Sequence, residues 1–548
     1  MRDLAYLKLL SREYPNIRAA ASDIINLQAI CGLPKGTEYF FSDLHGEHEA
    51  FIYLLRSSSG IIREKIRETF GHIISEEDEV RLANLIYYPE KMINQIKQAN
   101  EYTEDWQKTA VYRLVQICRE VSSKYTRSKV RKKMPREFSG VIDELLYVDN
   151  TDDNKTEYYS ELINTLIDVR VADSFIVVIC SLIRSLTIDN LHILGDIFDR
   201  GPRPDIILEE LMHFHDVDIQ WGNHDISWMG AATGNRACIC NVLRMALGYN
   251  GFDVLEDGYG INLRPLSMFA ERVYRDDPCT CFLPQILDKN IYDAVDPKLA
   301  AKMHKAIAVL QYKEEGQIIK RHPEYGMEER ILLSAIRYDR GTVTIDGKEY
   351  PMRDMNFPTV DPADPLRLTD EEEELLHTLE LSFRHNARLH EHVRFLYSNG
   401  SMYKCCNSNL LYHGCIPMTE NREFDGLMVG GKMYRGKELM DFIDTQVKNA
   451  YFLPEDAPEK EACRDFMWYL WNGAKSPVFG KDKNRSFEHY FIEDPEVMRE
   501  TMNPYYQLSE EEETCDMILK EFGLPTKGSH IINGHMPVKI KSGETPIR

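Results

Sequence analysis

Residues Leu191–Gly201 read LHILGDIFDRG, an apolar run that ends abruptly in acidic residues and an arginine. The apolar part, residues 191–194, predicts a buried strand, and Asp196 follows it directly. Helical patterns at 173–185 and 206–214 surround this strand, and residues 218–221 predict the next one. This alternation is typical of an open α/β sheet with right-handed crossovers, which places its chemistry where the strands end.

The other predicted strands end in the same kinds of side chain. They are followed by Asp43 and His45 (after 37–42), Asn223 and His224 (after 218–221), His413 (after 410–412) and His535 (after 531–533). A single Gly-His or Asp-x-His pair is usually structural, but five such strand ends in one chain are hard to explain by packing alone. Among the histidines between 377 and 413, only His413 follows a strand and precedes a glycine.

Composition limits the kind of partner that this chain can have. Of its 548 residues 43% are hydrophobic and 28% are charged, with a net charge of −22, which is typical of a globular protein. The negative charge argues against nucleic-acid and membrane-surface partners. The charged N-terminus does not resemble a signal peptide, and the twelve cysteines lack zinc-site spacing, so we expect reduced thiols and a cytoplasmic protein.

The length indicates two or three structural units. Residues 61–170 separate the first two motifs by far more than the roughly 30 residues of a strand–helix–strand unit, and their pattern is helical. We therefore predict an α/β (α+β) fold of four layers, a two-sheet sandwich flanked by helices and carrying a helical insertion. The expected segments are N-terminal helices and first strand at 1–60, helical insertion at 61–170, catalytic core at 171–250, a second mainly helical insertion at 251–400, and core again at 401–548. Within the second insertion, helices are expected near 290–340 and over 370–399.

The strand-end residues suit a pair of divalent cations. Such pairs use a bridging carboxylate with carboxylate, amide and imidazole ligands, and Asp196 fits the bridge because it ends the central strand. Asp43 and His45 can then bind one metal ion. The second metal ion would be bound by Asn223, His413 and His535. A hydroxide bridging the two metal ions would be a nucleophile at neutral pH.

The remaining motif residues suit the hydrolysis of a phosphate ester. His224 follows a ligand directly and can protonate the leaving oxygen as a general acid. Asp199 can accept a hydrogen bond from His224 and fix its tautomer. Arg200 offers a planar guanidinium to two phosphate oxygens. The predicted reaction is in-line attack on a phosphomonoester.

These motifs, in their order, resemble those of the calcineurin-like metallophosphoesterases. Pro537 stands where many members carry one more histidine, a feature shared with the serine/threonine phosphatase branch. The blocks LEDGYGINL (255–263), HVRFLY (392–397), NSNLLYHGCIP (407–417) and WYLWNG (468–473) are similar to class III fructose-1,6-bisphosphatases, a bacterial family. The resemblance implies hydrolysis of fructose 1,6-bisphosphate to fructose 6-phosphate in gluconeogenesis, with manganese as the metal. It also implies a C-terminal region longer than the one present here.

A bisphosphate needs cations away from the metal ions. Lys481, Lys483 and Arg485 form a compact basic cluster after Gly480. A solvated surface loop is the ordinary interpretation of such a cluster, and the alternative hypothesis is that it binds the distal phosphate. One alternative function is a protein serine/threonine or dinucleoside polyphosphate phosphatase, which shares the metal motifs. Another is an inactive scaffold of the same fold. The expected partner is a small sugar bisphosphate, and the chain could form a homo-oligomer.

Overall fold

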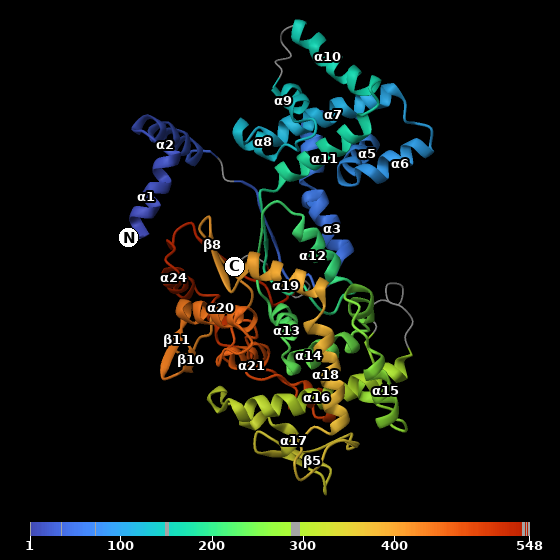
Figure 1. Cartoon of the computed structure of the whole chain (residues 1–548), viewed down its shortest axis with the longest axis vertical. Coiled ribbons are helices and arrows are strands. Elements are labelled where there is room, and N and C mark those ends of the chain that lie inside the picture. Colours follow the sequence, from blue (N-terminus) through green and yellow to red (C-terminus); the bar gives the residue numbers. More distant parts are fainter. Residues whose placement is uncertain are drawn as a thin grey trace. The chain divides into compact units, whose positions relative to one another are not determined.

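The strands that carry the motifs lie within one or two residues of their predicted positions in the computed structural model. The model describes residues 2–33, 36–71, 73–147, 153–285, 296–539, 543 and 545 (Figure 1). The motif strands are β1 (Glu38–Phe41), β2 (Asn190–Ile193), β3 (Val217–Gln220), β9 (Asn409–Tyr412) and β12 (His530–Ile532).

Two small sheets carry these strands. The first has the order β1-β2-β3-β7, and its edge strand β7 (Gly400–Ser401) runs parallel to β3. The second has the order β12-β9-β8, with β12 parallel and β8 (Tyr403–Cys406) antiparallel to β9. Two antiparallel sheets contain the remaining strands. One pairs β10 (Gly426–Val429) with β11 (Lys432–Arg435). In the other, β5 (Thr342–Ile345) lies between β4 (Ile336–Arg337) and β6 (Lys348–Pro351). The mixed α/β fold with a helical insertion is confirmed.

The chain divides into two compact units. Unit 1 comprises Met1–Tyr39 and Ile52–Leu191, and unit 2 comprises Phe40–Phe51 and His192–Arg548. Residues 61–170, expected as a helical insertion, fall in unit 1. Its helices are α1 (Arg2–Glu13), α2 (Ile17–Cys31), α4 (Ile61–Phe70), α5 (Glu76–Tyr87), α6 (Pro89–Gln98), α7 (Glu104–Ser122), α8 (Arg127–Lys133), α9 (Ser139–Tyr147), α10 (Asp153–Asp168) and α11 (Ala172–Thr187). Helix α3 (His48–Ser57) continues from unit 2 into unit 1.

Apolar faces and side-chain caps explain the helices of unit 1. Val111, Leu114 and Cys118 recur on one face of α7 and are fully buried against α11. Ser75, at the start of α5, accepts a hydrogen bond from the amide of Asp78 at 3.1 Å. Such caps satisfy amides that have no partner in the first turn.

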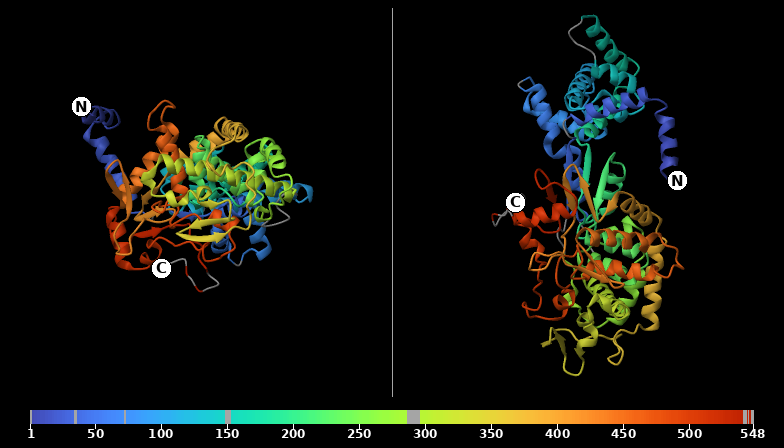
Figure 2. Two further views of the ribbon diagram at one scale, coloured as in Figure 1. Left: turned by 90° about the horizontal axis from the view of Figure 1, so that it is seen from below. Right: turned by 90° about the vertical axis from the view of Figure 1, so that its left-hand side faces the viewer.

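The core of unit 2 is built around α13 (Asn223–Ala232), in which all ten residues are buried. A helix buried on every side is typical of the centre of a large domain. Helices α14 (Arg236–Gly248) and α21 (Lys460–Asn472) pack against it, and α16 (Pro297–Arg321) packs against α14 (Figures 1 and 2). Because α13 begins at Asn223, the predicted ligand and its neighbour His224 stand at the start of this buried helix.

Two helices expected in the second insertion differ from the prediction. The residues over 370–399 form two helices, α18 (Asp370–Arg384) and α19 (Ala387–Asn399), because Asn386 caps a new helix by accepting from the amide of Leu389. The helix expected near 290–340 ends at Arg321, before Pro323, and gives way to short turns and to α17 (Leu332–Ala335). Residues 290–295 of that prediction lie outside the described residues.

The remaining helices of unit 2 are shorter or connect the strands. They are α12 (Pro204–Met212), α15 (Arg264–Val273), α20 (Gly436–Phe452), α22 (Ser486–Phe491), α23 (Tyr505–Leu508) and α24 (Glu512–Glu521). Single turns occur at Ser58–Gly60, Val254–Gly258, Thr280–Phe282, Pro323–Tyr325 and Glu328–Arg330. Within the described residues, no helix combines the length and apolarity that a membrane span requires.

Candidate active site

The ends of strands from both sheets meet in unit 2. Nδ1 of His413, which follows β9, lies 2.5 Å from the carbonyl oxygen of Leu194, which follows β2. The amide of His535, after β12, donates to Oδ2 of Asp43, after β1, at 3.0 Å. The amide of Asp43 in turn donates to the carbonyl of Gly195 at 3.0 Å. Residues far apart in the sequence thus form one site.

Asp196 lies at the centre of this site. Its Oδ2 is 3.3 Å from Nε2 of His413 and 4.0 Å from Nε2 of His45. Its carboxylate belongs to two groups in which all potential ligand atoms lie within 4.8 Å of one another, one with His45 and His224 and the other with His413 and His535. A carboxylate shared by two such groups has the position that a bridging ligand requires.

Three histidines present one ring nitrogen to the site and bond the other to the main chain. Nδ1 of His45 lies 3.1 Å from the carbonyl of Phe198, and Nε2 of His535 lies 3.1 Å from the carbonyl of Phe479. His413 makes the corresponding bond to Leu194. Since a carbonyl only accepts, each of these nitrogens carries a proton, and the opposite nitrogen of a neutral ring keeps a lone pair for a ligand. Metal-binding histidines are oriented in this way.

The pKa values reflect the crowding of these side chains. Burial lowers the pKa of His45 to about 4. Burial and the nearby charge of His413 lower the pKa of His535 to about 3. Both rings are therefore neutral. Burial also disfavours charge on His413, yet the carboxylate of Asp196 raises its pKa to about 9. Burial likewise disfavours the Asp196 carboxylate, but His413 and His224 hold its pKa well below the usual range. Two neutral imidazoles and one ionised carboxylate are ready to bind cations.

Asn223 supplies a separate indication of a cation-binding site. Its residue is 7% exposed, and its Oδ1 is buried with no hydrogen-bond partner among the described residues. Leaving a buried carbonyl oxygen without a partner costs about 1–3 kcal/mol, so the atom is expected to have one in the working protein. The donors present are oxygen and imidazole, with no thiolate. They suit manganese, iron or zinc rather than a metal such as Cu(I), which prefers sulfur ligands. The residues therefore fit a metal centre.

The backbone of the site is held in an unusual conformation. Asp43, His45, Asp196, Asp199, Arg200 and His535 all have positive φ, between 43° and 69°. Six of the nine predicted metal and catalytic residues thus occupy a region that L-residues rarely adopt, and such strain gathers at functional sites. The glycines serve close packing: a Cβ atom at Gly222 would lie 2.2 Å from Oδ1 of Asp196.

One functional residue was not assigned a role from the sequence. Asp225, fully buried at the start of α13, accepts hydrogen bonds from the amides of Asp196, Ile197 and Gly222 at 2.8–2.9 Å. It thereby ties the loop after β2 to the loop after β3. Burial and the charge of Asp196 raise its pKa to about 6. Its place in the Gly-Asn-His-Asp motif was the signal that could have identified it.

His224 is fixed from several sides. Its Nδ1 lies 2.6 Å from Oδ2 of Asp199, the hydrogen bond expected from the sequence, and Trp228 donates to the other oxygen of Asp199 at 2.8 Å. Trp471 packs against the imidazole edge to face, with ring centroids 4.9 Å apart. Burial opposes charge on His224, but Asp196 and Asp199 raise its pKa. Its Nε2 is left as the nitrogen that can transfer a proton.

The predicted phosphate-binding cations differ in their surroundings. The charge of Arg200 contributes to lowering the pKa of His45, after burial and His224, so Arg200 lies beside the site. Lys481 contributes in the same direction to the pKa of His535, after burial and His413, and pairs with Glu500 at 2.6 Å. Lys483 and Arg485 form ion pairs with Asp346 in the β5–β6 turn instead.

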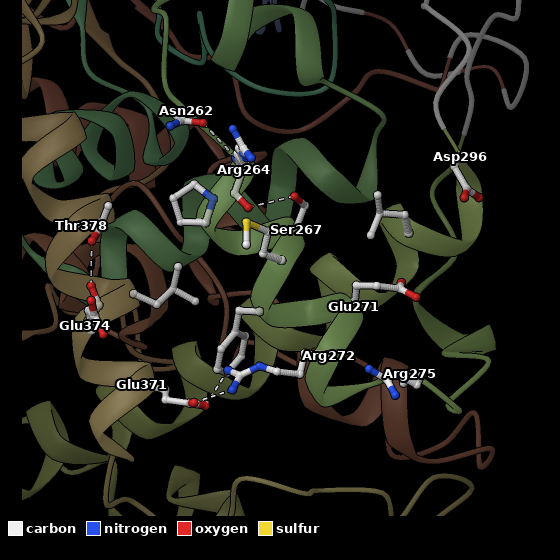
Figure 3. Close-up of a pocket in the computed structure, with 15 residues that line it drawn as sticks. Asn262, Arg264, Ser267, Glu271, Arg272, Arg275, Asp296, Glu371, Glu374 and Thr378 are labelled. Carbon is white, nitrogen blue, oxygen red and sulfur yellow. Dashed lines mark hydrogen bonds and ion pairs between the residues drawn. The ribbon is translucent and has the colours of Figure 1, made fainter.

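A separate cavity lies away from this site. It measures about 1120 Å³ and lies between α15, α18 and the start of α16 (Figure 3). Its lining contains three arginines, at 264, 272 and 275, and four acidic side chains, Glu271, Asp296, Glu371 and Glu374. Arg272 is paired with Glu371. A lining with net charge −1 does not suit a bisphosphate. None of the predicted ligands lines this cavity.

Comparison with known proteins gives a consistent result over the whole length. A family described as Firmicute fructose-1,6-bisphosphatase matches residues 5–548. The class 3 fructose-1,6-bisphosphatase of Clostridium tetani is 51% identical over 545 residues, which cover 100% of this chain and 82% of that relative. Proteins of the same name from Clostridium novyi and Bacteroides fragilis are each 50% identical over 547 residues, with the same coverage. No solved structure matches the chain.

Proposed function

This chain belongs to the family of Firmicute fructose-1,6-bisphosphatases, and from this premise we propose that the cluster around Asp196 is its catalytic centre. The chain is a phosphoric monoester hydrolase that converts fructose 1,6-bisphosphate to fructose 6-phosphate and phosphate, a reaction of gluconeogenesis. This favours the sugar bisphosphatase over the two alternative functions considered from the sequence. The family is metal-dependent, and the residues that hold the metal are the subject of the proposal.

The observation that carries the proposal is the position of Asp196 in both ligand groups. We assign Asp43, His45 and Asp196 to one divalent cation. To the other we assign Asp196, Asn223, His413 and His535. Manganese suits this mixture of carboxylate, amide and imidazole ligands. When bound, two such cations would neutralise phosphate charge and activate a water molecule for attack.

The chain's own residues carry the remaining steps. Arg200 binds two oxygens of the phosphate that is cleaved, because its planar guanidinium matches their spacing. His224, with Nδ1 held by Asp199, donates the proton on Nε2 to the sugar oxygen as the ester bond breaks. Asp199 accepts the hydrogen bond from Nδ1, so that Nδ1 keeps its proton while Nε2 gives one up. Trp471 restricts the ring to one orientation.

The experiment that tests the function is a comparison of substrates. Phosphate release is measured with manganese from fructose 1,6-bisphosphate, an aryl phosphate and a phosphopeptide. We expect turnover of the sugar bisphosphate to exceed that of both other substrates. Preference for the phosphopeptide would contradict the assigned substrate class. Loss of the sugar activity in EDTA, restored by manganese, is expected as well.

Lys481 is the first contact proposed for the distal phosphate, because its segment reaches the site: Nε2 of His535 lies 3.1 Å from the carbonyl oxygen of Phe479, two residues before Lys481. Lys483 and Arg485 would complete the cationic cluster. Replacing Lys481 and Lys483 with Ala is expected to raise KM for the bisphosphate about 10- to 100-fold, since a charge-assisted hydrogen bond contributes ~1.5–3 kcal/mol. The aryl phosphate, which has no second phosphate, should keep its KM. Steady-state kinetics with both substrates measure this difference.

A matched control is Lys475→Ala. Lys475 belongs to the same segment but is paired with Asp425. It should leave both KM values within about twofold. If the double variant raises KM equally for the bisphosphate and the aryl phosphate, the cluster does not bind the distal phosphate. The metal site would remain supported in that case.

A further inference from the structure

The N-terminal helices α1 and α2 are drawn in dark blue in Figure 1. Many of their apolar side chains are exposed to solvent. Ten of the fifteen residues of α2 are Ile, Leu, Ala or Cys, yet none of its residues is buried within the described part of the chain. A helix that is apolar around most of its circumference is normally enclosed by neighbours. We call α1 and α2, residues 2–31, the arm.

The exposed side chains of the arm are large. Leu4, Leu7 and Leu9 in α1 are 58–62% exposed, and Ile17, Ile24 and Ile25 in α2 are 63–87% exposed. With the other apolar side chains of both helices they expose on the order of 1,000 Å², taking ~150–200 Å² for a fully exposed large side chain. A standard protein–protein interface uses about 800 Å² of each partner. The arm alone therefore offers enough area for a stable interface.

The two helices of the arm are joined by a hydrogen bond, and the arm is almost without net charge. The hydroxyl of Tyr14, just after α1, donates to Asp23 in α2 at 2.7 Å, which joins the two helices. Arg18 and Asp23 are the charged residues of α2, and they balance. A surface without surplus charge is not built for a charged partner. Apolar interfaces of this kind are typical of permanent homodimers.

We propose that the arm is a dimerisation element that packs against the arm of a second copy of this chain. Two helical hairpins placed face to face form a four-helix bundle, in which each apolar stripe covers the other. A two-fold axis lets the same surface serve both copies, so the same apolar side chains of each copy are buried in one interface. The interface is independent of the metal site and of the reaction proposed above.

The test is the association of the 548-residue chain. Analytical ultracentrifugation over micromolar concentrations should give twice the 63.7 kDa chain mass for the wild type. An acidic-arm variant, with Leu7, Ile24 and Ile25 replaced by Glu, should sediment as a monomer, with Kd raised at least a hundredfold. Glu is a good helix former, so the helices should persist. The matched control is Met268→Glu, a 62% exposed apolar residue of α15, which should leave Kd unchanged.

A second variant separates loss of contact from misfolding. A basic-arm chain, with the same three residues replaced by Lys, should also be monomeric alone. Mixed in equal amounts, the acidic-arm and basic-arm chains should form a heterodimer, because opposite charges then face each other. A monomeric wild type, an acidic-arm variant that still dimerises, or a mixture that stays monomeric would each overturn the proposal.

Discussion

The Asp196→Asn variant is expected to lose at least about 10³-fold in kcat/KM for fructose 1,6-bisphosphate. Removal of a single hydrogen-bond donor to a transition-state oxyanion typically costs about 10²–10³-fold in kcat, and we expect the loss of a bridging ligand to cost more. Asn keeps the shape of the side chain but removes the charge at the centre of both ligand groups. His413 would lose the carboxylate that lies 3.3 Å from its Nε2. Metal content, measured by atomic mass spectrometry on the desalted protein, should fall together with activity.

The control for Asp196→Asn is Asp218→Asn. Asp218 is another buried strand carboxylate with a histidine partner, since Nδ1 of His192 lies 2.8 Å from its Oδ2. This pair contains no predicted ligand, so the variant should keep metal content and activity within about tenfold. Equal losses in the two variants would mean that any buried carboxylate in this fold is needed for stability. Asp196→Asn with more than a tenth of wild-type activity would exclude the bridging role.

The His224→Asn variant should slow fructose 1,6-bisphosphate hydrolysis about 10²- to 10⁴-fold in kcat, the usual contribution of a general acid. With p-nitrophenyl phosphate the loss should be much smaller, because nitrophenolate leaves without protonation whereas a sugar alkoxide does not. Asp199→Asn should act in the same direction with a smaller effect, since it disturbs the tautomer of His224. Steady-state rates with the two substrates provide the comparison.

His392 offers the control for this second prediction. It is 1% exposed, and its Nδ1 lies 2.9 Å from the hydroxyl of Tyr259, so His392→Asn also breaks a buried hydrogen bond of unit 2. Its effect should be equal on the two substrates. If His224→Asn also slows both substrates by one factor, His224 acts on the metal site or on phosphate binding and does not protonate the leaving group.

The sequence was sufficient for the parts of the site that follow local rules. A strand that ends in Asp or His is recognisable from its apolar run, and the structure brings Asp43, Asp196, His413 and His535 together as expected. The choice of His413 among several histidines depended on a glycine and a preceding strand, and β9 ends one residue before it. The wider resemblance to calcineurin-like metallophosphoesterases stays a prediction.

What the sequence did not reveal depends on contacts between distant residues. The ion pairs that Lys483 and Arg485 form with Asp346 join positions more than 130 residues apart, and no local pattern indicates them. The three amides held by Asp225 are likewise set by the packing of two loops. The break between α18 and α19 was missed because the apolar pattern continues through it, although Asn386 is a good capping residue.

The number of manganese ions bound per chain tests most directly whether Asp196 bridges two metal ions. Wild-type protein is loaded with manganese, freed of excess metal and analysed by atomic mass spectrometry beside a protein assay. We expect two ions per chain in the wild type and fewer than one in Asp196→Asn, because that carboxylate serves both metal positions. A wild type that retains a single ion while hydrolysing fructose 1,6-bisphosphate at full rate would contradict the two-metal centre.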